Sequence, residues 1–192
     1  LAVSLGALYM INNISNEELS KRLRKSLLVS FTGFLVIFLF VVYNLFTMEG
    51  FAVNENNIIT MQEGKYLTNI LDMPVVLGMF LTGAVLLVAG VVLTLIKQTF
   101  TRGIWPSAIG TVMAVMAIFM IAGYNGTAYY PSVADLQSSL TLANSCSSEF
   151  TLKTMAIVSL IIPFVVAYIA YFWHKMDKKQ LTSEEMETSD KY

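Results

Sequence analysis

The chain offers few side chains whose types and spacing could support catalysis or bind a metal. It contains one histidine, His174, and one cysteine, Cys146. A single cysteine cannot form a disulfide within the chain or a cysteine-based zinc site, so we interpret Cys146 as a small buried apolar residue. His174 would need a second strong ligand to hold a haem; methionine could serve, and eleven are present, but methionine is also ordinary apolar filler. Because His174 follows Tyr171-Phe172-Trp173, we interpret it as part of an aromatic belt at a membrane surface.

Two carboxylates, Asp135 and Glu149, lie in and just after a segment rich in hydroxyl groups. This segment, residues 131–145, reads PSVADLQSSLTLANS, and we call it the hydroxyl-rich strip. The spacing of the carboxylates fits no acid–base template, so we expect them to be solvated or to cap a helix, as we expect of Ser148 or Thr151. The sequence has no Gly-rich phosphate loop, nucleophile elbow or zinc pattern. A net charge of −1 gives no indication of nucleic-acid binding.

The elements that carry these residues are predicted to cross a membrane. Only 13% of the 192 residues are charged, about half the share usual in soluble domains, and 56% are hydrophobic. Four segments without Asp, Glu, Lys or Arg are each about 30 Å long as helices, which matches the hydrocarbon core of a bilayer. Backbone groups in lipid must be paired within the segment, so the spans are helices. These spans are residues 26–48, 74–96, 104–124 and 154–174.

Residues 1–11 are apolar but too short to cross a bilayer. We interpret them as the end of a preceding transmembrane helix, so we expect the chain to be a piece of a longer protein. The predicted fold class is an all-α integral membrane protein: a four-transmembrane-helix bundle plus the end of that preceding helix.

Positive charge predicts the orientation of the spans. Ten of the twelve Lys and Arg residues lie in three segments, 12–25, 97–103 and 175–192. By the positive-inside rule these segments are a cytoplasmic loop, a second cytoplasmic loop and a cytoplasmic C-terminal tail. Residues 49–73 and 125–153 are then external loops. Because the spans contain no Asp, Glu, Lys or Arg, we expect no charged proton relay within them.

Small residues predict how the spans pack. Gly83 and Gly90 are seven residues apart and share a helix face, and Gly110 and Ala114 form a small-xxx-small pair. We favour packing within this bundle over a dimer face. Span 26–48 is bulky all round and is expected to face lipid or a partner. Pro163 is expected to kink the last helix, whereas Asp72-Met73-Pro74 reads as a helix start with Asp72 near the cap.

The order of residues around the strip resembles the end of subunit II of cytochrome bd-type quinol oxidases. The resemblance is specific around residues 129–155 and extends over nearly the whole chain, including LTNILDMPVVLGMF before and within the second span. Cys146 stands where a small non-thiol residue is expected. The matching positions are Tyr130, Pro131, Ser138, Ser139, Leu140, Thr141, Ser147, Ser148, Thr151, Leu152 and Met155.

The resemblance implies a subunit with eight spans in two four-helix units, of which this chain supplies the second. It implies a bacterial cytoplasmic-membrane complex that oxidises quinol and reduces dioxygen to water. Two b-type haems and a d-type haem belong to subunit I, the expected partner, and a small single-helix subunit can accompany the pair. No catalytic, cofactor-binding or metal residue is carried over to this chain.

From the matching positions we expect an external structural cap over the bundle, hydrogen-bonded to its own turns and to the partner subunit. Its residues are Pro131, Ser138, Ser139, Thr141, Ser147, Ser148 and Thr151. Two other functions remain open from the sequence. One is half of a secondary transporter, which would show broken helices and polar groups at mid-membrane depth. The other is a tetraspan interaction protein outside any enzyme complex.

Overall fold

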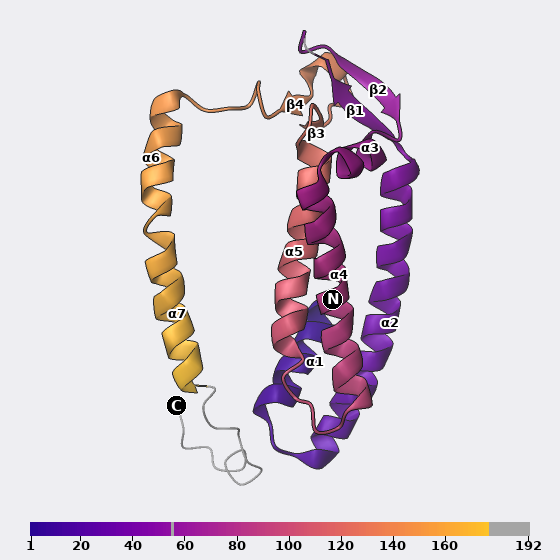
Figure 1. Ribbon diagram of the computed structural model, residues 1–192, viewed down its shortest axis with the longest axis vertical. Coiled ribbons are helices and arrows are strands. Elements are labelled where there is room, and N and C mark those ends of the chain that lie inside the picture. Colours follow the sequence, from indigo (N-terminus) through magenta and orange to yellow (C-terminus); the bar gives the residue numbers. More distant parts are fainter. Residues whose placement is uncertain (55, 177–192) are drawn as a thin grey trace.

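The computed structural model describes residues 1–54 and 56–176, and the predicted tail beyond residue 176 lies outside the described residues (Figure 1). Four helical stretches are long and apolar enough to cross a membrane, which confirms the all-α integral membrane class. The elements are α1 (Ala2–Asn13), α2 (Glu17–Thr47), β1 (Glu49–Val53), β2 (Ile59–Glu63), α3 (Lys65–Asp72), α4 (Pro74–Ile96), α5 (Ile104–Gly123), β3 (Ala128–Tyr130), the 3-10 turn η1 (Leu136–Ser138), β4 (Leu140–Thr141), α6 (Glu149–Ser159) and α7 (Ile162–Met176).

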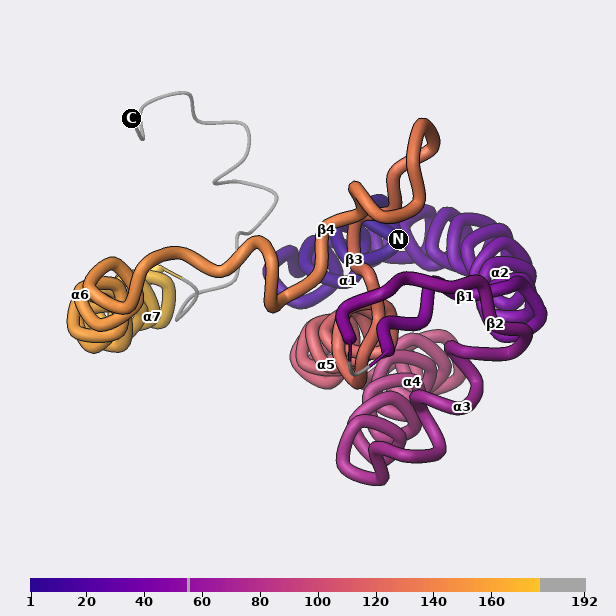
Figure 2. The backbone as a smooth tube through the Cα atoms, turned by 90° about the horizontal axis from the view of Figure 1, so that it is seen from above, coloured from indigo at the N-terminus to yellow at the C-terminus, as the bar shows by residue number. Residues whose placement is uncertain are grey.

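The long helices lie roughly along one axis, with α5 antiparallel to α4, and the strands lie at one end of them (Figure 1). In Figure 1, α2, α4 and α5 stand side by side, and β1–β4 and α3 all lie at their upper end. The α1–α2 link, the α4–α5 turn and the end of α7 lie at the opposite end. Figure 2, seen along the helices, shows α6 and α7 standing apart from α4 and α5. The three basic segments therefore share one end of the molecule, as far as residue 176.

Helices α4 and α5 approach closely because glycines line their contact. A Cβ atom added at Gly83 would lie 2.7 Å from the backbone nitrogen of Ala114, and one at Gly110 would lie 2.5 Å from the carbonyl oxygen of Gly83. Ser107, fully buried, donates its hydroxyl to the carbonyl of Leu87 at 3.2 Å. Small residues let two backbones meet and gain van der Waals contact where lipid supplies no hydrophobic drive. The preference for packing within this bundle is confirmed for these residues.

Helix α1 packs across α2 and α4 through a separate apolar cluster. Its buried members are Ala7, Leu8, Ile11, Leu27, Phe31, Leu87 and Val91. Within this contact the hydroxyls of Ser4 and Ser30 hydrogen-bond at 3.0 Å. Arg24 then ties α2 to the α4–α5 turn, donating to the carbonyls of Lys97 and Gln98 at 3.4 and 2.8 Å. These carbonyls follow the last turn of α4, and that of Lys97 also accepts from the N–H of Phe100 at 3.0 Å.

The first long helix begins nine residues before the expected span. Residues 17–25, assigned from their charge to the loop 12–25, form the first turns of α2. Asn16 caps the helix, accepting from the backbone N–H of Leu19 at 3.0 Å, and Glu17 and Glu18 favour its N-terminus. Charge keeps this segment out of the hydrocarbon but does not stop it from being helical.

The two loops expected on the far side both contain regular structure. The first, 49–73, forms the antiparallel hairpin β1–β2 and the amphipathic helix α3. Pro74 stands in the first turn of α4 and Asp72 lies next to its N-cap, Met73, as predicted; Asp72 is also the last residue of α3. In the second loop, 125–153, β3 pairs with β4, and a helix begins at Glu149.

The last span is interrupted rather than continuous. Helix α6 ends at Ser159, and α7 begins at Ile162, one residue before Pro163. Proline has no N–H to donate to the carbonyl of Ser159, four residues earlier, and its ring would clash with that carbonyl, which accounts for the break. Every described residue from 149 to 176 is exposed within this chain. An apolar helix of this length must be covered by lipid or by protein.

Candidate functional site

The hydroxyl-rich strip folds around Ser139. This side chain is fully buried; its hydroxyl donates to the carbonyl of Leu136 at 2.7 Å and accepts from the N–H of Ser132 at 2.9 Å. Asp135 caps η1, accepting from the N–H of Gln137 at 3.3 Å and from the hydroxyl of Ser138 at 2.8 Å. The expectation that this carboxylate caps a helix is confirmed. It is held by local donors and is not aimed at a second carboxylate.

A second turn closes the strip through reciprocal bonds. Thr141 donates its N–H to the side-chain oxygen of Asn144 at 2.7 Å, and Asn144 returns its N–H to the hydroxyl of Thr141 at 3.1 Å. The amide of Asn144 also donates to the carbonyl of Ser139 at 2.9 Å, and Ser145 donates to the carbonyl of Thr141 at 2.6 Å. The hydroxyl groups thus satisfy the backbone of an irregular segment that lacks a long ladder of its own.

The strip is joined to the β1–β2 hairpin at one residue. Gln137 accepts from the N–H of Ile59 at 3.0 Å and donates to its carbonyl at 2.9 Å, so the side-chain amide acts as an added strand residue. Nearby, the N–H of Val53 donates to the carbonyl of Gly126 at 2.8 Å. Sequence reasoning missed Gln137, because an amide gives no spacing signal for a partner 78 residues away.

A buried asparagine connects α3 to the end of α5. Asn69 is fully buried, and its amide donates to the carbonyl of Ile121 at 2.9 Å and to the hydroxyl of Thr127 at 2.7 Å. Its side-chain oxygen accepts from Asn125 at 3.3 Å. The last carbonyls of α5 thereby gain a donor that the helix cannot supply. Asn69 was also missed; a polar residue on the apolar face of amphipathic α3 is the signal that could have found it.

Tyr66 fixes the other side of α3 against β1. Its side chain is buried, and a Cβ atom on Gly50 would lie 3.2 Å from its ring. Burial in apolar surroundings raises the pKa of the Tyr66 phenol, and a backbone hydrogen bond at Phe51 opposes the rise. The ring therefore stays neutral and packs as an apolar side chain.

The remaining predicted cap residues lie outside this network. Pro131 and Ser147 are exposed, and Ser148 and Thr151 stand at the start of α6. Ser148 caps α6, accepting from the N–H of Thr151 at 3.4 Å, which confirms that expectation. The structure thus brings Ser138, Ser139 and Thr141 together but places the other four positions at the ends of the strip and beyond it.

Cys146 and Glu149 lie on the link between the strip and α6. Cys146 is exposed, so its interpretation as a buried residue is wrong. The chain leaves the strip at Ser145 and crosses to α6 without passing through a core (Figure 1). Glu149 lies in the first turn of α6 and pairs with Lys153 at 2.6 Å, both side chains largely exposed. Neither residue faces a partner suited to catalysis.

His174 lies in the last turn of α7 beside a groove of about 280 Å³. The other residues lining it are Trp105, Val166, Ile169, Ala170 and Trp173. Trp173 lies near Tyr9 of α1, with ring centroids 6.5 Å apart, so the end of α7 contacts α1. Lys175 lies 4.9 Å from the centre of the Tyr171 ring. This is the aromatic and cationic setting of a helix end at a membrane surface.

Within the part of the chain that the structure describes, the surroundings of His174 do not fit a haem. None of the groove residues beside His174 offers a second strong ligand. Over residues 1–54 and 56–176, no group of three or more His, Cys, Asp and Glu side chains could hold a metal ion. A hydrogen-bonded cap joins the ends of helices whose outer faces are apolar.

Comparison with known protein families gives a match over the described helices. The family model for cytochrome bd terminal oxidase subunit II matches residues 1–176. The chain belongs to this family. A search of curated protein sequences finds no significant match. Membership confirms the resemblance seen around the strip and makes this multi-pass membrane protein a subunit of a respiratory oxidase, within an oxidoreductase complex.

Proposed function

We propose that this chain is a haem-free, non-catalytic part of subunit II of a quinol:dioxygen oxidoreductase. In this role it braces a haem-bearing subunit I, which oxidises quinol and reduces dioxygen to water at two b-type haems and a d-type haem. The observation that carries the proposal is the family match over residues 1–176, together with a lone His174 whose surroundings do not fit a haem.

The apolar helix surfaces support the pairing with another subunit. The most apolar window of α6 and α7 is 0% buried within this chain, and that of α2 is 11% buried. Side chains such as Phe40, Phe164 and Phe172 are exposed along them. Surfaces of this extent on a membrane protein are covered by lipid or by packed helices. A heterodimer with subunit I, with or without a small single-helix subunit, provides such packing.

The charge distribution supports an orientation in a bacterial cytoplasmic membrane. Arg24, Lys97 and Arg102 lie at one end of the helices, with the end of α7. By the positive-inside rule this end is cytoplasmic, so the hydroxyl-rich strip is external. The strip then acts as a structural cap above the membrane that is tied to the β1–β2 hairpin through Gln137. Beside it, Asn69 joins α3 to the end of α5 and to Thr127.

The break between α6 and α7 is a feature that transporters also show. Here Leu160 and Ile161 at the break are apolar and exposed, and Pro163 accounts for it. A broken helix that binds an ion or substrate presents polar groups or backbone to a cavity. The oxidase subunit is therefore the better supported function.

A test of the cap uses Ser138→Ala, Ser139→Ala and Thr141→Ala combined in the assembled complex. Loss of the buried Ser139 hydroxyl leaves the Ser132 N–H without its partner and removes one of the two bonds to the Leu136 carbonyl, which keeps the backbone N–H of Ser139. We therefore expect less subunit I to be recovered with this chain. Ser147→Ala, on the exposed link, is the control. Unchanged subunit recovery and haem content in the triple variant would overturn the role of the cap and leave the family assignment intact.

A further inference from the structure

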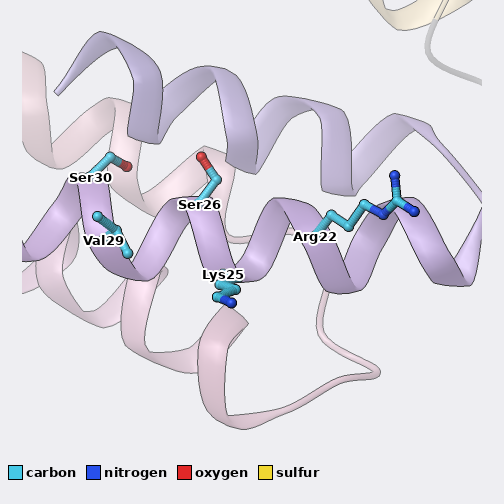
Figure 3. Close-up of a pocket in the computed structure, with 5 residues that line it drawn as sticks. All are labelled: Arg22, Lys25, Ser26, Val29 and Ser30. Atoms are coloured by element: carbon cyan, nitrogen blue, oxygen red, sulfur yellow. The ribbon is translucent and has the colours of Figure 1, made fainter.

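A depression of about 440 Å³ lies on one face of α2 near its basic end (Figure 3). Five residues line it: Arg22, Lys25, Ser26, Val29 and Ser30. Their spacing of three and four places them on one face of the helix. Figure 3 shows Arg22 and Lys25 toward the end of α2, with Val29 and Ser30 further along. The depression thus begins with two cations and continues into apolar surface.

Both cations are available to a ligand. The Arg22 side chain is 75% exposed and pairs with Glu18 at 2.5 Å through one nitrogen, and a guanidinium carries five N–H donors. Lys25 is exposed. Arg24 differs, because its guanidinium already bonds the carbonyls after α4. Ser30 is also engaged, with Ser4 and with the carbonyl of Leu27, so Ser26 supplies the free hydroxyl of the depression.

An apolar stripe extends from the depression toward the middle of the membrane. Val29, Gly33, Val36 and Phe40 follow at alternating steps of four and three, and the three side chains are 68%, 63% and 67% exposed. A Cβ atom on Gly33 would meet nothing within 4 Å, so the stripe is open at that point. From Ser26 to Val36 the helix rises about 15 Å, half of a hydrocarbon core of about 30 Å.

We propose that this face of α2 binds one anionic phospholipid. Arg22 and Lys25 hold the phosphate, the hydroxyl of Ser26 donates to it, and an acyl chain lies along Val29, Gly33 and Val36. We choose a phospholipid as the occupant because the cations, the hydroxyl and the apolar stripe follow one another along the helix. A lipid has its negative charge at the membrane surface and its apolar part directly beneath, which is complementary to this face at both depths. The stripe covers the length of one acyl chain.

The test uses the complete oxidase complex in detergent, stripped of lipid and titrated with dioleoyl phosphatidylglycerol under native mass spectrometry. Each basic residue near a membrane surface contributes roughly 1 kcal/mol to the free energy of binding an anionic lipid. The complex carrying both Arg22→Gln and Lys25→Gln should therefore bind this lipid about 30-fold more weakly. The control is Lys97→Gln with Arg102→Gln, which removes the same charge at the same end of the helices and should bind like the unmodified complex. Dioleoyl phosphatidylcholine, with no net charge, should show no such difference between variants.

Two further measurements separate a lipid from other occupants. Glycerol 3-phosphate should not displace the lipid, because it lacks an acyl chain; displacement would mean a site for free phosphate and would overturn the proposal. A photo-cross-linker placed at Val29 in the otherwise unmodified complex should add the mass of a phospholipid. A cross-link to another protein subunit, or equal binding of phosphatidylglycerol by both double variants, would also overturn it.

Discussion

Gln137 completes the edge of β2 by bonding both backbone groups of Ile59, at 3.0 and 2.9 Å. One side chain of the strip thus joins two segments that lie on either side of α4 and α5 in the sequence. Because Ile59 is itself buried, its N–H and carbonyl cannot turn to water when the amide is lost. This link closes the cap above the helix pair.

Gln137→Ala should loosen the cap without unfolding the helices. Two hydrogen bonds of about 1 kcal/mol each are lost, so amide exchange around Ile59 should become roughly 30-fold faster. Hydrogen–deuterium exchange with mass spectrometry reads this directly. Gln62→Ala, an exposed glutamine on the same strand, should leave exchange at Ile59 unchanged. Equal exchange in the two variants would mean that the Gln137 pair contributes nothing.

Asn69→Leu should destabilise the junction of α3 and α5 more severely. The substitution removes the donor to Ile121 and Thr127 inside a site without exposed surface, at a cost of about 2–4 kcal/mol. We expect a lower midpoint of thermal unfolding in detergent. Asn44→Leu, the same substitution at an exposed position of α2, is the matched control and should lower the midpoint of thermal unfolding only slightly. Similar midpoints for both variants would contradict the role of Asn69.

Tyr66 predicts a loss of stability at alkaline pH. The pKa of the Tyr66 phenol is raised in the folded chain. The contribution of Tyr66 to the free energy of unfolding is therefore fully present below its ordinary pKa of 10.0, and it is lost as the pH rises through the pKa of the folded chain. Above that ordinary value the unfolded chain ionises first, which favours unfolding. Tyr66→Phe should therefore flatten the fall in unfolding midpoint between about pH 9.5 and 11. Tyr130→Phe, at an exposed position, should keep the full slope; identical slopes would refute the assignment.

Gly83→Val should separate α4 from α5. The added side chain meets the backbone of Ala114 and Gly110, which cannot rotate away, so we expect a loss of about 3 kcal/mol or failure to accumulate in the membrane. Gly78→Val in the same helix meets nothing within 4 Å and is the control. Membrane yield and unfolding midpoint together report the outcome. Equal tolerance of both substitutions would show that the close approach is not needed.

Sequence alone could predict the parts of this fold that depend on local physics. The start of α4 follows from Pro74, and its end follows from the first charged residue after an uninterrupted apolar run. The glycine contact of α4 with α5 was predictable because small residues at helical spacing have few other uses in lipid. A kink at Pro163 is also predictable, because proline lacks the N–H that a helix needs at that position.

The parts that could not be predicted depend on distant partners. The helical start of α2 was assigned to a loop because Lys21, Arg22 and Lys25 report membrane depth and not backbone conformation. Gln137 and Asn69 act through segments 78 and 52 residues away, for which one sequence gives no pairing signal. Cys146 was expected to be buried from its residue type, whereas its exposure follows from the path of the chain to α6.

The most direct test of a non-catalytic subunit II is the haem content of the complex purified through a tag on this chain. We expect the reduced-minus-oxidised absorption spectrum to show haem in the unmodified complex and an identical spectrum, per mole of complex, with His174→Leu. A pigment band that disappears with His174, or a purified chain that brings no haem-bearing partner with it, would contradict the account.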